Sequence, residues 1–280
     1  MKKSFIAILC LLLFLCVGIA QAALAAEKVV QVKKKDGTEL GRYEGLADAI
    51  KAASGHDNPT FVLLKNFDVG KNINMSNATL NMNNFGLTFK NTATFNNVTI
   101  QNQGRRITIE NRAKVELKNS TLDLHNNFIE VKSGGTLIVD GSTIENGRNI
   151  TYTGENLVIE GQAYATNTAI KKAEGKGGAI YAQAGAKVTI KNNSILKNNK
   201  ANYGGAIFIC GDDNAKNEAA LEIVEGTFEN NETLIIRGTF QGQPRDLPSR
   251  GGAIYICRNN RTIRFFRSVN LKNYQSTFPV

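Results

Sequence analysis

A seven-residue phrase recurs three times in the second half of the chain. It reads GGAIYAQ at 177–183, GGAIFIC at 204–210 and GGAIYIC at 251–257, with spacings of 27 and 47 residues. Each copy joins a glycine pair, which suits a tight backbone turn, to an alternating segment that is typical of a strand. A pocket that is built once does not need three copies. The repetition therefore predicts an architecture of stacked, similar units.

Short alternating segments separated by turn residues fill the chain from about residue 79 onward. They indicate strands, and no long helical pattern interrupts them. The offsets between apolar positions also repeat: Ile129 and Ile180 are each followed by apolar residues at +8 and +15, and Ile207 at +14 and +21, displaced by a polar loop around 211–218. The segments are LTF (87–89), VTI (98–100), ITIE (107–110), VEL (115–117), TLDL (121–124), LIVD (137–140), LVIE (157–160) and VTIK (188–191).

These offsets predict an all-β fold, a right-handed parallel β-helix of the pectin-lyase-like type. Three short strands per period of roughly 20–27 residues would form one coil, and each strand would pair with its equivalent one coil away, at about 4.8 Å. A β-sandwich is the alternative, but it does not require matching offsets in successive periods. Asparagine tolerates the left-handed backbone of sharp corners and can form hydrogen-bonded ladders along a stack. Asparagine pairs recur at 83–84, 96–97, 126–127, 192–193, 198–199, 230–231 and 259–260.

An amphipathic helix is expected before the coils. Residues 46–53 place Leu46, Ala49, Ile50 and Ala53 on one helical face. The first coil of a stack has unpaired edges and an open apolar end, and a short helix laid over it would cover both. We therefore expect this helix to be an N-terminal cap, with a small separate linker domain as the alternative.

The chain is expected to contain three parts. Residues 1–25 have the form of a secretory signal peptide, with two lysines, an apolar run and small residues, and an uncleaved anchor is the alternative. Residues 26–75 would form the cap and the first coil, and residues 76–280 the β-helix. We see no cap near Val280, so the chain is expected to be a fragment of a longer protein or one whose frame ends early.

The strand of each repeat is expected to have an inward and an outward column. Isoleucines would fill the narrow interior, and the aromatic residues between them would face outward as a stripe. Such a stripe could stack on sugars, or its rings could pack on one another or beneath loops. The inward residues are Ile180, Ile207 and Ile254, and the outward residues are Tyr181, Phe208 and Tyr255.

Two cysteines remain after removal of the signal peptide. Cys210 and Cys257 both occupy the seventh position of the repeated phrase. If residues 232–250 are an insertion within one coil, the two lie directly above one another and can form a disulfide. If residues 233–238 are instead a strand of an extra coil, they lie two coils apart, near 10 Å, and cannot bridge. We expect the insertion, and therefore the disulfide.

Long insertions on a rigid scaffold are where recognition usually resides. The segments 211–219 and 232–250 are the two candidates, and the second contributes Arg237, Arg245 and Arg250 to a possible binding surface. The formal net charge of +10 could attract acidic glycans, lipid headgroups or nucleic acid, but the cations are scattered, which favours general solubility.

Catalytic, metal and cofactor signatures are missing from the sequence. Asp123 and Asp140 fall in separate coils, and neither His56 nor His125 belongs to a recognisable catalytic phrase. The adjacent carboxylates at 212–213 lie in a polar loop and are expected to be solvated. We therefore expect no catalytic residue, no metal and no cofactor, although the fold also hosts polysaccharide lyases and hydrolases.

The repeats resemble those of the chlamydial polymorphic outer membrane proteins and, more widely, bacterial GGAI-repeat surface proteins. That family's repeats read GGAI and F-x-x-N. Here Phe228 to Asn231 fits F-x-x-N, whereas Ile195 to Asn198 puts isoleucine in the aromatic position, and the likeness covers roughly 160–260. The resemblance implies an autotransporter-like passenger domain that acts as an adhesin and is carried by a C-terminal barrel. The final residues TFPV do not continue into barrel-type strands.

The sequence as a whole predicts an exported cell-surface repeat protein, outer membrane-associated or extracellular. It would be an adhesin or passenger-like binding module without catalysis. Its expected partner is a protein or glycan on a host or neighbouring cell, with no nucleic acid, and with membrane contact only through an anchor or barrel outside this sequence. A polysaccharide-processing enzyme and a purely structural stalk are the alternatives.

Overall fold

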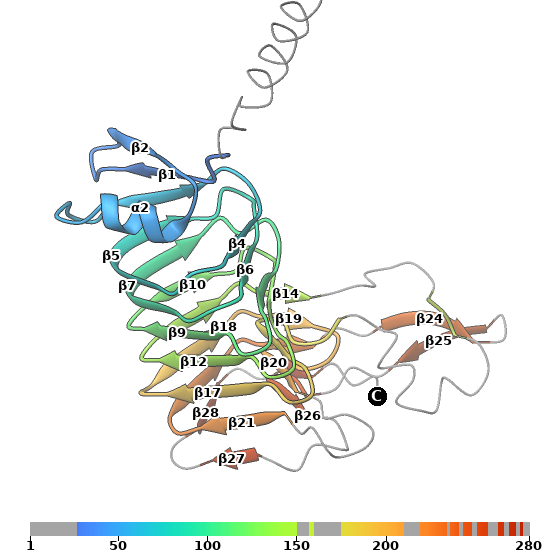
Figure 1. The fold of residues 1–280 in the computed structure, drawn as a ribbon. Coiled ribbons are helices and arrows are strands. Elements are labelled where there is room, and N and C mark those ends of the chain that lie inside the picture. Colours follow the sequence, from blue (N-terminus) through green and yellow to red (C-terminus); the bar gives the residue numbers. More distant parts are fainter. Residues whose placement is uncertain are drawn as a thin grey trace, which may run out of the picture.

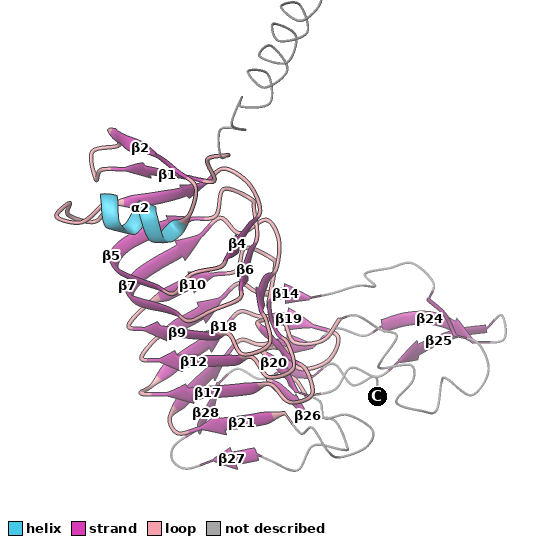
Figure 2. Cartoon of the chain, in the orientation of Figure 1, coloured by secondary structure: helices cyan, strands magenta, loops and turns pink. Residues whose placement is uncertain are grey.

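The structure is a computed structural model in which the chain is mostly β-strand. It describes residues 27–149, 157–159, 175–209, 219–233, 236–240, 243–247, 251–256, 263–265, 269–272 and 275–276. Within these residues a single helix accompanies the strands, as Figures 1 and 2 show. The all-β prediction is therefore confirmed. The signal peptide predicted at 1–25 lies outside the described residues.

A small antiparallel unit with the helix forms one end of the molecule (Figure 1). β1 (Val30–Lys33) pairs with β2 (Glu39–Tyr43) and with β3 (Thr60–Leu63), and α2 (Leu46–Ala52) lies between β2 and β3 in the sequence. The helix buries Leu46 and Ala49 and packs against β1, β2 and β5 (Ile73–Asn81). Ala53 is also buried and Ile50 is partly buried, so the predicted apolar face is confirmed.

Beyond this unit, the strands of three sheets pair in parallel with strands from the preceding and following stretches of chain. The largest sheet contains β1–β3 and β5 (Ile73–Asn81), β7 (Ala93–Gln101), β9 (Lys114–Lys118), β10 (Thr121–Asp123), β12 (Thr136–Asp140), β13 (Thr143–Glu145), β17 (Lys187–Lys191), β18 (Ser194–Lys197), β21 (Ala220–Ile223), β22 (Gly226–Glu229), β27 (Ile263–Phe265) and β28 (Val269–Lys272). It divides at β7, whose first half pairs with β9 and whose second half pairs with β10.

The other two parallel sheets are shorter. We call the first the seven-stranded sheet: β4 (Phe67–Val69), β6 (Leu87–Phe89), β8 (Ile107–Ile109), β11 (Ile129–Val131), β16 (Ile180–Ala182), β20 (Ile207–Ile209) and β26 (Ile254–Ile256). The second contains β14 (Arg148–Asn149), β19 (Lys200–Ala201), β23 (Glu232–Thr233) and β29 (Gln275–Ser276). The strands thus recur in sets such as β16–β17–β18–β19, and each strand pairs with its equivalents in the neighbouring sets. The fourth strand of each set has only two residues, so the alternation of apolar and polar residues in the sequence does not reveal it.

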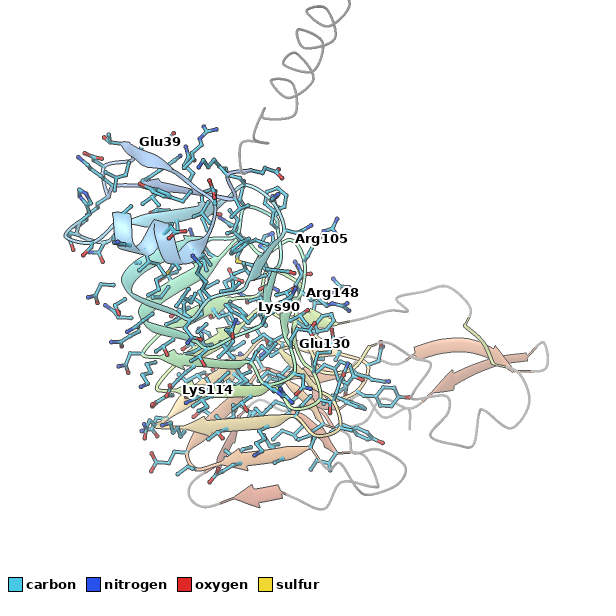
Figure 3. The ribbon with its side chains drawn as sticks, in the orientation of Figure 1. Glu39, Lys90, Arg105, Lys114, Glu130 and Arg148 are labelled. Atoms are coloured by element: carbon cyan, nitrogen blue, oxygen red, sulfur yellow. The ribbon has the colours of Figure 1, made fainter. Side chains whose placement is uncertain are left out.

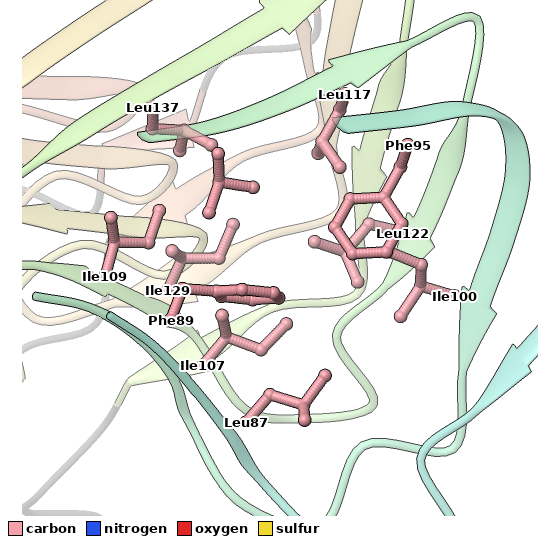
Figure 4. A pocket seen from close by; sticks show the side chains of 11 residues that line it. Leu87, Phe89, Phe95, Ile100, Ile107, Ile109, Leu117, Leu122, Ile129 and Leu137 are labelled. Carbon is pink, nitrogen blue, oxygen red and sulfur yellow. The ribbon is translucent and has the colours of Figure 1, made fainter. Parts of the chain in front are cut away.

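The expected file of interior isoleucines is present. Ile129 pairs with Ile180, Ile180 with Ile207, and Ile207 with Ile254. The first three are at most 1% exposed, and Ile254 is partly buried against the same apolar core. Figure 4 shows part of this core, where the ring centres of Phe89 and Phe95 lie 5.9 Å apart in an edge-to-face arrangement. The side chains drawn there line an apolar cavity of about 10 Å³. A gap of that size and lining holds no ligand.

Asparagine occupies the corners, as predicted. Every described asparagine pair of the sequence has at least one member with positive φ. Side chains connect equivalent corners: Asn97 Nδ2 donates to Asn77 Oδ1 at 2.8 Å, and Asn199 Nδ2 donates to Asn231 Oδ1 at 2.9 Å. The positive-φ members are Asn83, Asn84, Asn97, Asn126, Asn192, Asn193, Asn198 and Asn230.

The structure corrects the spacing of one corner. Leu196, and not Ile195, is level with Ile144 and Phe228, because the set that contains β17 and β18 has one extra residue in its corner at 191–193. Ile195 is level with Thr143 and is partly exposed. The counterpart of the motif at 228–231 is therefore 196–199.

Two insertions leave the parallel sheets and meet beside them (Figure 1). β15 (Leu157–Ile159) pairs with β24 (Ile236–Phe240), which forms a hairpin with β25 (Gln243–Leu247). Residues 157–159 of the segment 157–160, expected as a strand of the stack, therefore belong to a separate three-stranded sheet. β20 pairs directly with β26, so β24 and β25 belong to an insertion and not to an extra set of strands. The predicted bounds 232–250 begin too early, because residues 232–233 form β23, which pairs in parallel with β19.

Free-thiol titration tests the disulfide. Cys210 and Cys257 lie outside the described residues, but the strands that precede them pair directly at about 4.8 Å, within the usual Cα range of a disulfide. We expect the protein exported to an oxidising compartment to release two thiols only after reduction. Two thiols that react without reduction would contradict the bridge.

Alanine at the second glycine of the repeat is expected to destabilise the fold. A Cβ on Gly205 would lie 2.0 Å from the carbonyl oxygen of Gly252, and only a shift of the backbone could relieve this clash. We expect Gly205→Ala to lower the free energy of unfolding by about 1–3 kcal/mol, measured by urea denaturation. Gly70→Ala is the matched control, because a Cβ there meets nothing within 4 Å. Equal stability of the two variants would refute this account of the glycine pair.

Candidate functional site

The outer face of the seven-stranded sheet carries one continuous column of polar and aromatic side chains. Thr108, Glu130, Tyr181, Phe208 and Tyr255 occupy equivalent positions on β8, β11, β16, β20 and β26. Each follows a core isoleucine in its strand, so all five belong to the alternate, outer side. The parallel register therefore brings together residues up to 147 positions apart in the sequence.

The predicted aromatic stripe exists, but it is partly closed. The Phe208 ring lies 5.7 Å from Tyr181, edge to face, and 5.3 Å from Tyr255, stacked. Phe208 is only 1% exposed, whereas the two tyrosines are partly exposed. Tyr203 adds a fourth ring, 5.6 Å from Tyr255. Of the alternatives expected for the stripe, packing of the rings on one another describes Phe208, because the rings of Tyr181 and Tyr255 cover it. Tyr181 and Tyr255 remain accessible at its sides.

A lysine extends the aromatic cluster. Lys176 Nζ lies 5.7 Å from the ring centre of Tyr181 and 5.6 Å from that of Phe208. Both distances are within the range of cation–π attraction. The aromatic cluster of Tyr181, Tyr203, Phe208 and Tyr255 therefore has a cation over two of its rings, which sequence spacing did not indicate.

Glu130 is the unusual member of the column, because a carboxylate on an outer face is normally solvated. Its side chain is only 6% exposed. Gln183 Nε2 donates a hydrogen bond of 2.8 Å to Oε1, and Lys132 Nζ lies 3.3 Å from the same oxygen. Arg106 Nε lies 3.3 Å from Oε2, but without hydrogen-bond geometry, so Oε2 is a buried acceptor held by charge attraction alone. Figure 3 labels Glu130 among the side chains.

The carboxylate and the aromatic cluster influence one another. Burial raises the pKa of the Tyr181 phenol above its ordinary 10.0, and the negative charge of Glu130 raises that pKa further. The two residues are level on adjacent strands. We refer to Arg106, Glu130, Lys132, Lys176, Tyr181 and Gln183 together as the Glu130 cluster.

Two of the three arginines predicted for the binding surface lie on strands away from this cluster. Arg237 lies on β24, level with Asp246, and Arg245 lies on β25, level with Gly238. Both are therefore on the separate three-stranded sheet, and Arg250 lies outside the described residues.

The carboxylates that could have indicated an enzyme have structural partners. Asp123 Oδ1 accepts from the backbone N–H of His125 and from Asn146 Nδ2. Asp140 lies 3.0 Å from Lys191 Nζ; burial alone would raise the pKa of Asp140, but hydrogen bonds from Asn192 and Lys191 lower it below 3.8. Within the part of the chain that the structure describes, no group of three or more His, Cys, Asp or Glu residues could hold a metal ion.

A polar groove of about 300 Å³ lies between the helix and β5. His56, Asp57 and Asn58 line one side, and Asn74 and Ser76 line the other. His56 is exposed here, as a residue of the loop that follows the helix.

The sequence contained a signal for Glu130 that spacing alone could have exposed. Ile129 and Ile180 begin equivalent strands, so the residues after them, Glu130 and Tyr181, share one column. Lys132 follows Glu130 by two positions in the same stretch of chain, whereas Arg106 precedes β8 and Gln183 follows β16, and an analysis of one strand at a time does not connect these two with Glu130.

Comparison with known proteins identifies no relative: no family model, no curated protein and no solved structure matches this chain. Among the described residues, no helix has the length and apolar character that a membrane span requires.

Removal of the Glu130 charge is expected to lower the pKa of Tyr181 toward 10.0. The raised pKa means that the protonated phenol stabilises the fold below pH 10, a contribution that is lost as the pH rises through the raised value. In Glu130→Gln the charge component disappears, so Tyr181 ionises at lower pH. The difference between tyrosinate absorbance titrations with and without Tyr181→Phe measures this. Glu116→Gln, in the largest sheet, is the control and should leave the titration unchanged.

Proposed function

We propose that this chain is an exported cell-surface binding module built on a right-handed parallel β-helix. Its ligand would be a saccharide on a host or neighbouring cell, bound without catalysis, as an adhesin or passenger-like domain binds. The repeated sets of parallel, in-register strands support the β-helix. The signal-peptide pattern of residues 1–25 supports export.

The observation that carries a binding role is the outer column of the seven-stranded sheet. Aromatic rings with accessible edges and a cation above them are the groups that bind the apolar faces and the polar rims of sugars. Tyr181 and Tyr255 remain partly exposed on either side of the buried Phe208, which fixes their positions. A rigid pair of rings loses little conformational entropy on binding.

A purely structural stalk and a polysaccharide-processing enzyme are the rival functions. A stalk gives no reason to hold a cation over two rings. Glycoside cleavage requires a pair of suitably separated carboxylates, whereas in the Glu130 cluster one carboxylate is surrounded by cations and an amide. These two features favour binding over both rivals.

Truncation of Tyr181 is expected to weaken attachment to cells. We expect Tyr181→Ala in the full exported protein to reduce binding to glycan-bearing cells about tenfold or more, as loss of a central aromatic contact does. Tyr43→Ala, on β2 and equally half-buried, is the control and should bind normally.

Flow cytometry with labelled protein measures this, and treatment of the cells with glycosidases separates a glycan from a protein ligand. Equal binding by the wild type and Tyr181→Ala would exclude the column as the binding surface. Release of sugar fragments from a polysaccharide would replace the binding role with an enzymatic one.

A further inference from the structure

Among the residues that the structure describes, two cations contact Glu130 and a third lies over the ring beside it. The Glu130 carboxylate lies beside Arg106 and Lys132. The ring of Tyr181, on the adjacent strand, lies beneath Lys176. The Arg106 side chain is 54% exposed and that of Lys132 is 31% exposed, although Glu130 itself is 6% exposed. The carboxylate is thus beneath the cations, and the cations face the solvent.

This arrangement makes Glu130 a positioning residue. A buried carboxylate with one oxygen lacking a hydrogen bond is costly for stability, and such a group is rarely kept without a role. Here it lies 3.3 Å from Nε of Arg106, whose side chain is itself 54% exposed. A guanidinium has five N–H donors, and it binds carboxylate and sulfate groups through pairs of them.

The seven-stranded sheet places the cations next to the aromatic cluster. Glu130 and Tyr181 are level on adjacent strands, which lie about 4.8 Å apart. A negatively charged substituent over Arg106 and Lys132 would therefore have its sugar ring near Tyr181. Lys176, above the same ring, adds a further positive charge.

From this geometry we infer that the Glu130 cluster is a subsite for an acidic saccharide, one that carries carboxylate or sulfate groups. The inference rests on the proposed binding function and names the class of ligand. Arg106 and Lys132 bind the anionic group, Tyr181 contacts the ring, and Glu130 holds the cations in place.

The largest sheet provides an internal comparison. Glu116 is paired with Lys114 at 3.7 Å and with Lys118 at 3.3 Å, and its side chain is 14% exposed. Its neighbours in register are Thr94 and Ile138, so no aromatic ring is level with it on either side. This second carboxylate with two cations is an ordinary surface ion-pair group, and its lysines are matched controls for charge removal.

Titration calorimetry of the full exported protein tests the inference. The probes are an oligogalacturonate, a heparin oligosaccharide and a neutral cello-oligosaccharide of similar length. We expect the two acidic probes to bind more tightly than the neutral one, and more weakly as salt rises from 50 to 200 mM. We expect Arg106→Gln to weaken acidic binding about tenfold or more, and Lys118→Gln, which removes the same charge elsewhere, to leave it unchanged.

Each outcome supports or overturns the inference. Equal weakening by Arg106→Gln and Lys118→Gln would mean non-specific attraction by net charge and would overturn it. Neutral probes that bind as tightly as acidic ones, with loss in Tyr181→Ala but not in Arg106→Gln, would overturn the acidic subsite and leave the proposed function intact. No saccharide binding, together with normal cell attachment by Tyr181→Ala, would overturn both. Arg106→Lys, which keeps the charge but loses the paired donors, should bind between the wild type and Arg106→Gln, and unchanged circular dichroism excludes misfolding.

Discussion

The in-register pairing of equivalent strands is the constraint on which the rest of the structure depends. Because Ile129, Ile180, Ile207 and Ile254 are level on consecutive strands, one apolar interior runs through successive sets. The same register aligns the outer side chains, since alternate residues of a strand point to opposite faces. Interior packing and the composition of the outer columns are therefore fixed together, and a slip of one residue would exchange them.

The corners make this register possible. Glycine and asparagine supply the positive φ that other residues adopt only with strain, and asparagine side chains connect equivalent corners along the stack. The second glycine of the repeated phrase is needed for a different reason. The carbonyl oxygen of the equivalent glycine in the next strand set leaves no room for a Cβ. The glycine pair of the repeated phrase is thus explained by backbone geometry.

Repetition decides how much the sequence could predict. The isoleucine file, the helix at 46–52 and the corner asparagines were predictable, because each follows from a periodic pattern or a local propensity. Ile195 was placed one position wrongly, because an extra corner residue changes no local pattern. The segment 157–159 alternates as any strand does, and only its pairing with β24 reveals a different sheet. Glu130 was missed because a single carboxylate has no period, and its partners come from other strands.

The side sheet has a mechanical consequence. In a stack of repeats each unit contacts only its neighbours, so that melting can begin at one end and advance unit by unit. β15 departs after β14, and β24 departs after β23, so their pairing spans the two intervening strand sets and adds a contact between non-neighbours. Those sets can then separate only if this cross-tie also breaks. Unfolding that starts at the carboxyl-terminal sets would therefore slow at the residues between β16 and β23, which would unfold together as one cooperative unit.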